Sequence, residues 1–354
     1  MEQNSRKKFR ISFGLIFNIV IFALTVFLVI YFTFSKDGLL DLIKSGLPIH
    51  FGWILAAVIM HLLNIAIDAT IIYLFVKQSV PDLKVKTALT ASMVGQFYCA
   101  VTPSSTGGQP MQVLMMSRAG IKGSVATAAL VQKFLVWQFT LAAYCIVAVV
   151  SRFSFFSENL DPPMWVMSAI GFGAQLFMLV LLLLASFANN FSKKVAGGLF
   201  RFLGKLHILK NVDEKIGKMH ETLDSFHQSN QSLNKDKPLL VKAYILTAIQ
   251  MTALFLVPYC IARSFQISDL SIFDMLCAQS YVTMVSSMVP LPGGSGAAEY
   301  CFSTFFMAYI SPETMKSAIL LWRTITYYGT IMISLPFSGM KKKTVPVEAA
   351  AEKE

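Results

Sequence analysis

The stretch that decides the fold is an apolar run broken near its middle, LSIFDMLCAQSYVTMVSSMVPLPGGSGAAEYCFSTFFMAYI, residues 270–310. Proline removes a helical hydrogen-bond donor and glycine adds backbone freedom, so a helix ends where the Pro/Gly/Ser cluster 290–296 begins. A second apolar run, 87–117, is broken in the same way by the cluster 102–110. Each run therefore predicts two short helices joined by a tip. The tip residues are Pro103, Gly107, Gly108 and Pro110 in the first run and Pro290, Pro292, Gly293, Gly294 and Gly296 in the second.

Outside these two runs the chain carries unbroken apolar blocks. Hydrophobic residues make up 55% of the chain and charged residues only 14%, whereas soluble domains carry about 25% charged residues. A helix of roughly 20 residues crosses a hydrocarbon core about 30 Å thick. The predicted full spans are 13–34, 50–76, 124–150, 163–187, 239–262 and 317–336. The sequence thus predicts an all-α integral membrane protein with about six full transmembrane helices and no soluble catalytic domain.

The distribution of charge predicts how the two broken runs lie. The formal net charge is +11, and the basic residues cluster at the edges of apolar blocks, which indicates a membrane rather than nucleic acid as the partner. If both runs turn back and the N-terminus is cytoplasmic, most Lys and Arg face the cytoplasm. If 87–117 crossed instead, the strongly basic segment 188–238 would lie outside. We therefore predict two re-entrant hairpins, the first entering from the cytoplasm and the second from the opposite side.

This topology divides the chain into five parts. They are a basic cytoplasmic N-terminus 1–12, a first membrane half 13–187, a basic amphipathic linker 188–238, a second membrane half 239–336 and a charged cytoplasmic tail 337–354. Opposed, interrupted segments in two halves are typical of inverted-repeat transporters with a binding site near the midplane. The linker either lies on anionic headgroups or is an ordinary cytoplasmic helical connection, and the sequence leaves both readings open.

Ionisable side chains in or beside predicted spans are costly, so each is a candidate functional residue. The candidates are Asp68, Arg118, Lys133, Asp274, Glu299 and Arg323. His61, Asn64 and Asp68 form one polar stripe, because residues seven apart lie on nearly the same helix face. Structural explanations stay open for two of these residues. Glu299 suits the first turn of a helix whatever its function, and Arg323 could be its ion-pair partner.

Both tips precede helix N-termini, whose free N–H groups attract anions. Pro110 suits the first turn of one helix, and the other begins near Gly296. With Lys133 and Arg323 nearby, the tips predict a phosphate site, unless the loops only let helices pack closely. The sequence contains no nucleotide-binding loop, zinc-protease motif or nucleophile elbow, and its five cysteines lack metal-ligand spacing. We expect no cofactor, no metal and no catalytic residue.

The run Val289–Glu299, followed by Arg323 in the next span, resembles the membrane region of lysylphosphatidylglycerol synthase/flippase proteins, the multiple peptide resistance factor family. The block Pro103–Arg118 resembles the first hairpin of that family. Asp68 and Asp274 fall where the family has further acidic residues. The resemblance implies a flippase that moves an aminoacylated or other phospholipid between leaflets of the bacterial cytoplasmic membrane, with both termini cytoplasmic. The family's C-terminal domain, which transfers lysine from charged tRNA, is not expected in this chain.

We expect a lipid headgroup to bind between the two hairpins. Its phosphate would lie near Arg118, Lys133 or Arg323, and a cationic headgroup near Glu299, Asp274 or Asp68. One alternative is the membrane part of a phosphatidylglycerol lysyltransferase, which would reach tRNA only through a partner synthase. Another is a non-transporting scaffold for envelope synthesis. The expected partners are the phospholipid and the membrane, with a homo-oligomer left open.

Overall fold

Five long apolar stretches form the frame of the part of the chain that the computed structural model describes, residues 49–159, 162–205, 212–287, 289 and 291–339. They are Phe51–Lys77, Gly123–Phe153, Trp165–Leu184, Lys237–Ser264 and Pro312–Ser338, and each is long and apolar enough to cross a membrane. Five of the predicted spans are thereby recovered as helices. The predicted span 13–34, the N-terminus 1–12 and the tail beyond 339 lie outside the described residues.

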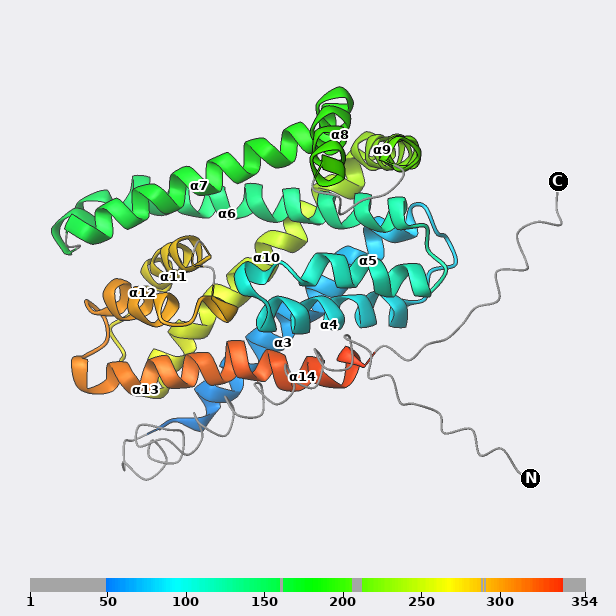
Figure 1. Ribbon diagram of the computed structural model, residues 1–354. Coiled ribbons are helices and arrows are strands. Elements are labelled where there is room, and N and C mark those ends of the chain that lie inside the picture. The colour runs from blue at the N-terminus through cyan, green and yellow to red at the C-terminus, as the bar shows by residue number, and fades with distance from the viewer. Residues whose placement is uncertain (1–48, 160–161, 206–211, 288, 290, 340–354) are drawn as a thin grey trace, which may run out of the picture. The chain divides into compact units, whose positions relative to one another are not determined.

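The long helices form one bundle in which some cross the others obliquely (Figure 1). They are α3 (Phe51–Lys77), α6 (Gly123–Asn159), α7 (Pro162–Phe187), α10 (Lys237–Ser264) and a C-terminal helix built from α13 (Pro312–Arg323), the π-turn η3 (Thr324–Tyr328) and α14 (Gly329–Ser338). The helix α3 packs along α10, and α6 packs against α7 and α10. Large apolar side chains point outward from this frame; Phe177 and Ile170 on α7 are 69% and 62% exposed. Such exposure suits a lipid-facing surface better than a surface in water.

Both broken apolar runs fold as helical hairpins. The first consists of α4 (Val85–Val101), the short turn η1 (Pro103–Ser105) and α5 (Gly108–Arg118); the second consists of α11 (Ile272–Ser286), η2 (Pro292–Gly294) and α12 (Ala297–Phe306). The two helices of each hairpin pack against each other, and η1 contacts η2. In Figure 1 the hairpins point toward one another from opposite ends of the long helices.

The helices of the hairpins are too short to cross a membrane on their own. The helix α4 has 17 residues and α12 has 10, which at 1.5 Å per residue gives roughly 26 Å and 15 Å, less than the hydrocarbon thickness of about 30 Å. Gly108 lets α5 approach α4 closely, because a Cβ atom there would overlap the sulfur of Cys99. The antiparallel hairpins are thus a property of the fold, and their re-entry into a membrane stays a prediction.

The hydrophobic core has two clusters, one around each hairpin. The larger one surrounds α11 and α12, where Phe302 stacks on Phe306 with ring centroids 4.4 Å apart and also contacts Trp322. The other joins α3, α4 and α6 and includes Phe75 and Met116. Each hairpin is therefore packed as part of the helical core, and the two tips contact each other.

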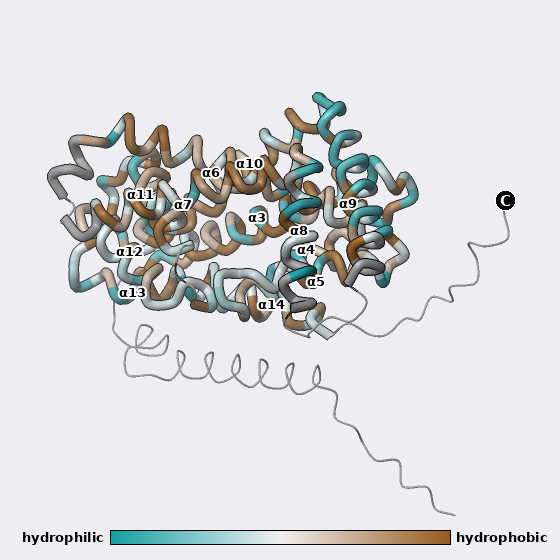
Figure 2. Tube along the Cα trace, turned by 45° about the horizontal axis from the view of Figure 1, so that its top comes forward, coloured by the Kyte–Doolittle hydropathy of each residue, from teal (hydrophilic) through white to brown (hydrophobic). Residues whose placement is uncertain are grey.

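The segment between the predicted membrane halves folds as two polar helices, α8 (Asn189–Lys205) and α9 (Val212–Lys235). Figure 2 shows α9 largely hydrophilic, in contrast to the apolar long helices. The two helices contact each other, and α9 packs on α6. Lys193 of α8 and Asp224 of α9 form an ion pair with a 2.6 Å separation.

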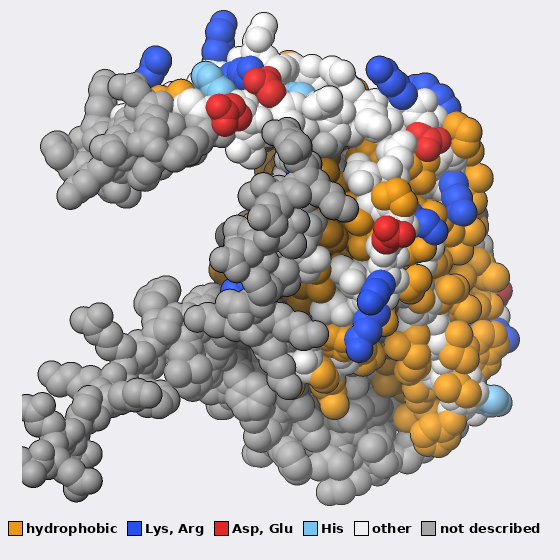
Figure 3. All heavy atoms as spheres, turned by 90° about the vertical axis from the view of Figure 1, so that its right-hand side faces the viewer, with side chains coloured by type: hydrophobic (Ala, Val, Ile, Leu, Met, Phe, Trp, Pro, Cys, Tyr) orange, Lys and Arg blue, Asp and Glu red, His pale blue; other side chains and the backbone are white. Residues whose placement is uncertain are grey.

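Basic side chains gather at the end of the bundle where α3 ends and α10 begins. Lys77 lies in the last turn of α3, Arg118 in the last turn of α5, Lys235 at the end of α9 and Lys237 at the start of α10. Figure 3 views this end and shows Lys and Arg side chains spread among hydrophobic ones. That this end faces the cytoplasm stays a prediction from the distribution of charge.

Candidate functional site between the hairpin tips

An ion pair joins the second hairpin to the C-terminal helix. Glu299 lies in the first turn of α12, where its carboxylate accepts a 2.6 Å hydrogen bond from the N–H of Gly296. Arg323, the last residue of α13, donates from Nε to Glu299 Oε1 over 2.8 Å and from Nη1 to the Gly293 carbonyl over 2.9 Å. The structure therefore combines both explanations of Glu299, as helix-start residue and as partner of Arg323.

The guanidinium of Arg323 is buried, but one of its hydrogen-bond donors has no acceptor among the described residues. Its side chain is 8% exposed, and the rings of Trp322 and Tyr327 lie 5.0 and 5.5 Å from its central carbon. Among the described residues, no atom accepts a hydrogen bond from its buried Nη2 group. A buried donor without an acceptor costs about 1–3 kcal/mol, and more when it is charged. An incoming anionic oxygen would remove that cost.

The two tips touch beside this guanidinium. Tyr327 donates a buried 3.1 Å hydrogen bond to the carbonyl of Ala100, near the end of α4, and its ring lies where a Cβ atom on Gly293 would be. The tips contain residues with positive φ, which glycine adopts without steric cost. They are Ser104 and Ser105 in the first tip and Gly293, Gly294 and Gly296 in the second. Glycine at 293 is thus required both by its φ of 61° and by the aromatic ring against it.

The remaining tip residues have ordinary structural roles. Gly107 donates its N–H to the side-chain oxygen of Thr102 over 2.9 Å, and Pro103 begins η1 as Pro292 begins η2. The helix α5 begins at Gly108, so that Pro110 falls in its first turn, as predicted. Pro290 lies outside the described residues.

A second ion pair joins α6 to α3. Lys133 Nζ of α6 is 2.5 Å from Asp68 Oδ1 of α3, and Ser92 of α4 donates to Asp68 Oδ2 over 2.6 Å. Asp68 is buried. Ser92 and Ala100 are eight residues apart on α4, so this pair lies roughly 12 Å along the helix axis from the tip contact.

The polar stripe on α3 is buried within the helix bundle. His61 Nε2 is 2.9 Å from the hydroxyl of Thr330 on α14, and Gln250 of α10 donates to Asn64 over 3.1 Å. Both side chains are buried and each joins α3 to a neighbouring helix. This geometry favours a packing role for His61 and Asn64.

Two predicted site residues lie apart from the tips. Asp274, in the first turn of α11, pairs with Arg152 of α6 over 2.5 Å. Arg118 is exposed in the last turn of α5, at the opposite end of that helix from the tip. The structure thus brings Glu299 and Arg323 together at the tips, and Asp68 and Lys133 together nearby, but places Asp274 and Arg118 elsewhere.

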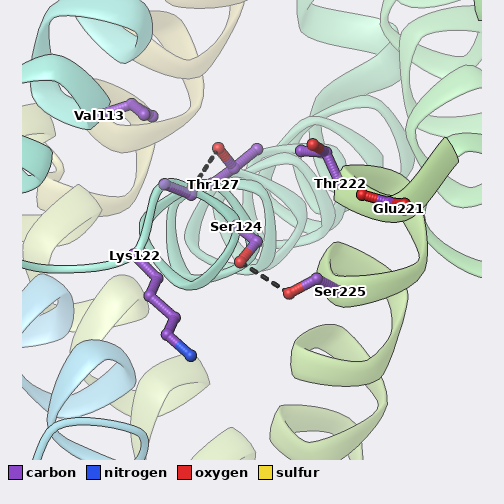
Figure 4. A pocket seen from close by; sticks show the side chains of 8 residues that line it. Val113, Lys122, Ser124, Thr127, Glu221, Thr222 and Ser225 are labelled. Carbon is purple, nitrogen blue, oxygen red and sulfur yellow. Dashed lines mark hydrogen bonds between the residues drawn. The ribbon is translucent and has the colours of Figure 1, made fainter. Parts of the chain in front are cut away.

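A hollow of about 640 Å³ lies at the base of the first hairpin, between α5, the start of α6 and α9 (Figure 4). Ser225 of α9 donates to Ser124 of α6 across it over 2.9 Å. In Figure 4 the Lys122 side chain is drawn with no interaction to this serine pair. None of the predicted site residues lines this hollow.

Sequence reasoning missed Ser92, Arg152 and Tyr327 as partners of the charged residues. Ser92 is one of many small polar residues in apolar helices, so nothing in the sequence marks it. Arg152 lies at the end of a span, where cations are common. Tyr327 did carry a signal, because a residue four positions after Arg323 falls on the same side of a helix.

The fold and the tip geometry define a multi-pass α-helical membrane protein with two opposed hairpins whose tips touch beside a partly buried ion pair. Comparison with known proteins agrees. The family model described as "Lysylphosphatidylglycerol synthase TM region" matches residues 15–334. The chain belongs to this family, as its resemblance to the family's hairpins indicated.

Two curated relatives support the same placement. A UPF0104 membrane protein of Archaeoglobus fulgidus is 26% identical over 275 residues, which cover 73% of this chain and 78% of the relative. An uncharacterized protein of Mycoplasma pneumoniae, named as an MG306 homolog, is 23% identical over 277 residues, covering 70% of this chain and 67% of the relative. Neither printed name states a substrate.

Proposed function

We propose that this protein moves a phospholipid between the leaflets of the membrane and binds the headgroup phosphate at Arg323, between the hairpin tips. The observation that carries this proposal is the buried Nη2 group of Arg323, for which no described residue supplies an acceptor. A guanidinium binds phosphate oxygens in a fixed, planar geometry, so a phosphodiester would use the donor that the protein leaves unused.

Charge balance supports an anionic or aminoacylated headgroup. The two ion pairs, Glu299–Arg323 and Asp68–Lys133, each carry no net charge. The side chain of Glu299 is 32% exposed, in contrast to 8% for Arg323. A phosphate can therefore bind Arg323 while an ammonium group on the same headgroup approaches the open side of Glu299. Phosphatidylglycerol and its lysyl ester are the substrates we propose to test.

The opposed hairpins support a headgroup-binding site within the membrane. Backbone that is not helical survives at membrane depth only where protein or a water-filled cavity satisfies its polar groups. Helix interruptions near the midplane of two membrane halves are the arrangement in which many transporters bind their substrates. The contact between η1 and η2 supports a headgroup site at that depth.

Leaflet exchange in proteoliposomes tests the proposal. Wild-type protein should exchange headgroup-labelled phosphatidylglycerol or its lysyl ester, and Glu299→Gln and Arg323→Ala should each abolish exchange of the preferred lipid. Lys316→Gln is the matched control, because Lys316 lies on α13 with Arg323 but is exposed. Each variant is first checked for monodisperse behaviour in detergent. Wild-type exchange rates in both site variants would contradict the proposal.

The family description favours one second candidate, the membrane part of a phosphatidylglycerol lysyltransferase. In that case the same Arg323 site would hold phosphatidylglycerol for a transferase supplied by another chain. Purified protein, mixed with charged tRNA and a candidate synthase, should then form the lysyl ester, and Arg323→Ala should prevent this. Lipid exchange without any synthase would favour transport.

A further inference from the structure

One side chain connects both tips to the C-terminal helix. The hydroxyl of Tyr327 holds the Ala100 carbonyl of the first hairpin at 3.1 Å, while its ring covers Gly293 of the second. The side chain is 9% exposed. Ala100 lies in the last turn of α4, where a carbonyl has no partner within its own helix. Tyr327 therefore satisfies a backbone group that opening of the tips would leave for water or a ligand.

Tyr327 also covers the proposed headgroup site. Its ring lies 5.5 Å from the guanidinium carbon of Arg323. The Trp322 ring also lies beside this guanidinium, 5.0 Å from its central carbon. Movement of the Tyr327 ring away from Gly293 would therefore both release the second tip and uncover Arg323.

The backbone at Tyr327 is irregular, which favours movement of this side chain. Tyr327 lies in the π-turn η3, Thr324–Tyr328, which interrupts the α-helical hydrogen-bond pattern directly after Arg323. Single π-turns within α-helices are uncommon and are frequent at functional sites. The proline Pro336, further along the same helix, lies beyond this turn.

We propose that Tyr327 is a positioning residue that holds the two hairpin tips together and closes access to Arg323. The lipid headgroup reaches the guanidinium when the hydrogen bond from Tyr327 to Ala100 opens. This inference rests on the proposed function in treating Arg323 as the headgroup site, but the tip closure itself can be measured without any lipid movement.

Tyr327→Phe removes the hydroxyl and keeps the ring, and Tyr327→Ala removes both. The matched control is Tyr144→Phe, since the Tyr144 hydroxyl also joins two helices, by a 2.6 Å hydrogen bond to Thr252. Two measurements are made on full-length protein in detergent. Hydrogen exchange with mass spectrometry follows the backbone amides of 102–109 and 291–296. Reaction with phenylglyoxal, which modifies accessible arginines, follows Arg323, with exposed Arg201 as the internal reference.

Loss of one intramolecular hydrogen bond shifts an opening equilibrium by about two- to tenfold. Tyr327→Phe should therefore raise amide exchange at both tips and the modification rate of Arg323 by about that factor, and Tyr327→Ala should raise both further. Tyr144→Phe should leave these rates at the wild-type values. Wild-type rates in Tyr327→Phe and Tyr327→Ala, or the same increase in Tyr144→Phe, would overturn the inference.

Lipid exchange in proteoliposomes separates this inference from the proposed function. Faster exchange in Tyr327→Phe, together with open tips, supports both. Open tips in a protein that moves neither lipid support the role of Tyr327 and contradict lipid transport. In the third outcome, lipid exchange depends on Arg323, but the Tyr327 variants leave the tips unchanged. That outcome supports transport and contradicts the role of Tyr327.

Discussion

Lys133 of α6 and the buried Asp68 of α3 form an ion pair, with Nζ and Oδ1 2.5 Å apart. Ser92 of α4 donates to the second carboxylate oxygen of Asp68, so that three helices meet at one carboxylate. In an apolar environment such a pair is weak evidence for stability, but the loss of one partner leaves an uncompensated buried charge. The pair therefore makes a sharp prediction about single and double variants.

Asp68→Asn or Lys133→Gln alone should lower the free energy of unfolding by about 3–5 kcal/mol, because each leaves one buried charge without its partner. The double variant should recover most of this loss, since both charges are removed together. Thermal unfolding in detergent measures the three variants. Asp82→Asn, at an exposed position, is the control. Additive losses in the double variant would show that the two side chains do not act as a pair.

Gly108→Ala should destabilise the first hairpin by about 1–3 kcal/mol, because the new Cβ would overlap Cys99 and press on the Gly95 carbonyl. Gly173→Ala on α7 is the matched control. A Cβ at 173 meets no atom within 4 Å, and alanine favours a helix over glycine. In thermal unfolding, Gly108→Ala should be less stable than wild type and Gly173→Ala should be more stable. Equal stability of the two would contradict the close contact of α4 with α5.

Arg323→Lys keeps the positive charge but should lower both stability and lipid exchange. A lysine cannot donate to Glu299 and the Gly293 carbonyl with the planar geometry of the guanidinium and still offer a further donor to a phosphate. We expect at least a tenfold loss of exchange, on the order of 1.4 kcal/mol or more. The control is Arg263→Lys near the end of α10. An unchanged rate in Arg323→Lys would mean that charge alone suffices at this position.

The contact between α8 and α9 should weaken in acid. Hydrogen bonds from Lys193 and then Asn189 lower the pKa of the exposed Asp224 carboxyl below its ordinary value. A carboxyl with a lowered folded-state pKa contributes stability that is fully present above about pH 3.9 and is lost as the pH falls through the lower, folded-state value.

Amide exchange in α8 is measured for wild type and for Asp224→Asn at each pH, and the ratio of the two rates is compared across pH. Taking the ratio cancels the intrinsic pH dependence of amide exchange. Wild type should be the better protected at neutral pH, and the two should converge in acid. Lys194→Gln, which changes the neighbouring exposed lysine, should follow wild type. A ratio independent of pH would remove Asp224 from the contact.

The sequence predicted the parts of the fold that depend on local chemistry. Length and hydropathy located the five spans in the described part of the chain, and the Pro/Gly clusters located both hairpin tips. The pairing of Glu299 with Arg323 was one of the alternatives that the sequence offered, and the structure contains that pair.

The partners of the other charges depend on how distant helices are rotated against each other, which no local pattern encodes. Asp68 was expected to face a headgroup, yet α6 packs so that Lys133 reaches it. Asp274 was expected beside a cationic headgroup, and the structure shows it at the start of α11, paired with Arg152. The π-turn is likewise invisible in the sequence, because its residues, TITYY, are compatible with an ordinary α-helix.

The π-turn in the C-terminal helix makes a structural prediction that deletion of a single residue can test. A π-turn accommodates one more residue than the α-helix around it, so it is equivalent to a single-residue insertion absorbed without a break. Deleting one residue from Thr324–Tyr328 would leave a regular α-helical turn and keep the residues after it in nearly the same orientation relative to Arg323. The contact of Thr330 with His61 should therefore persist, whereas the same deletion in a regular α-helix would rotate everything after it by about 100°. The π-turn thus adds one residue to the helix while Arg323 and Thr330 keep facing their separate partners.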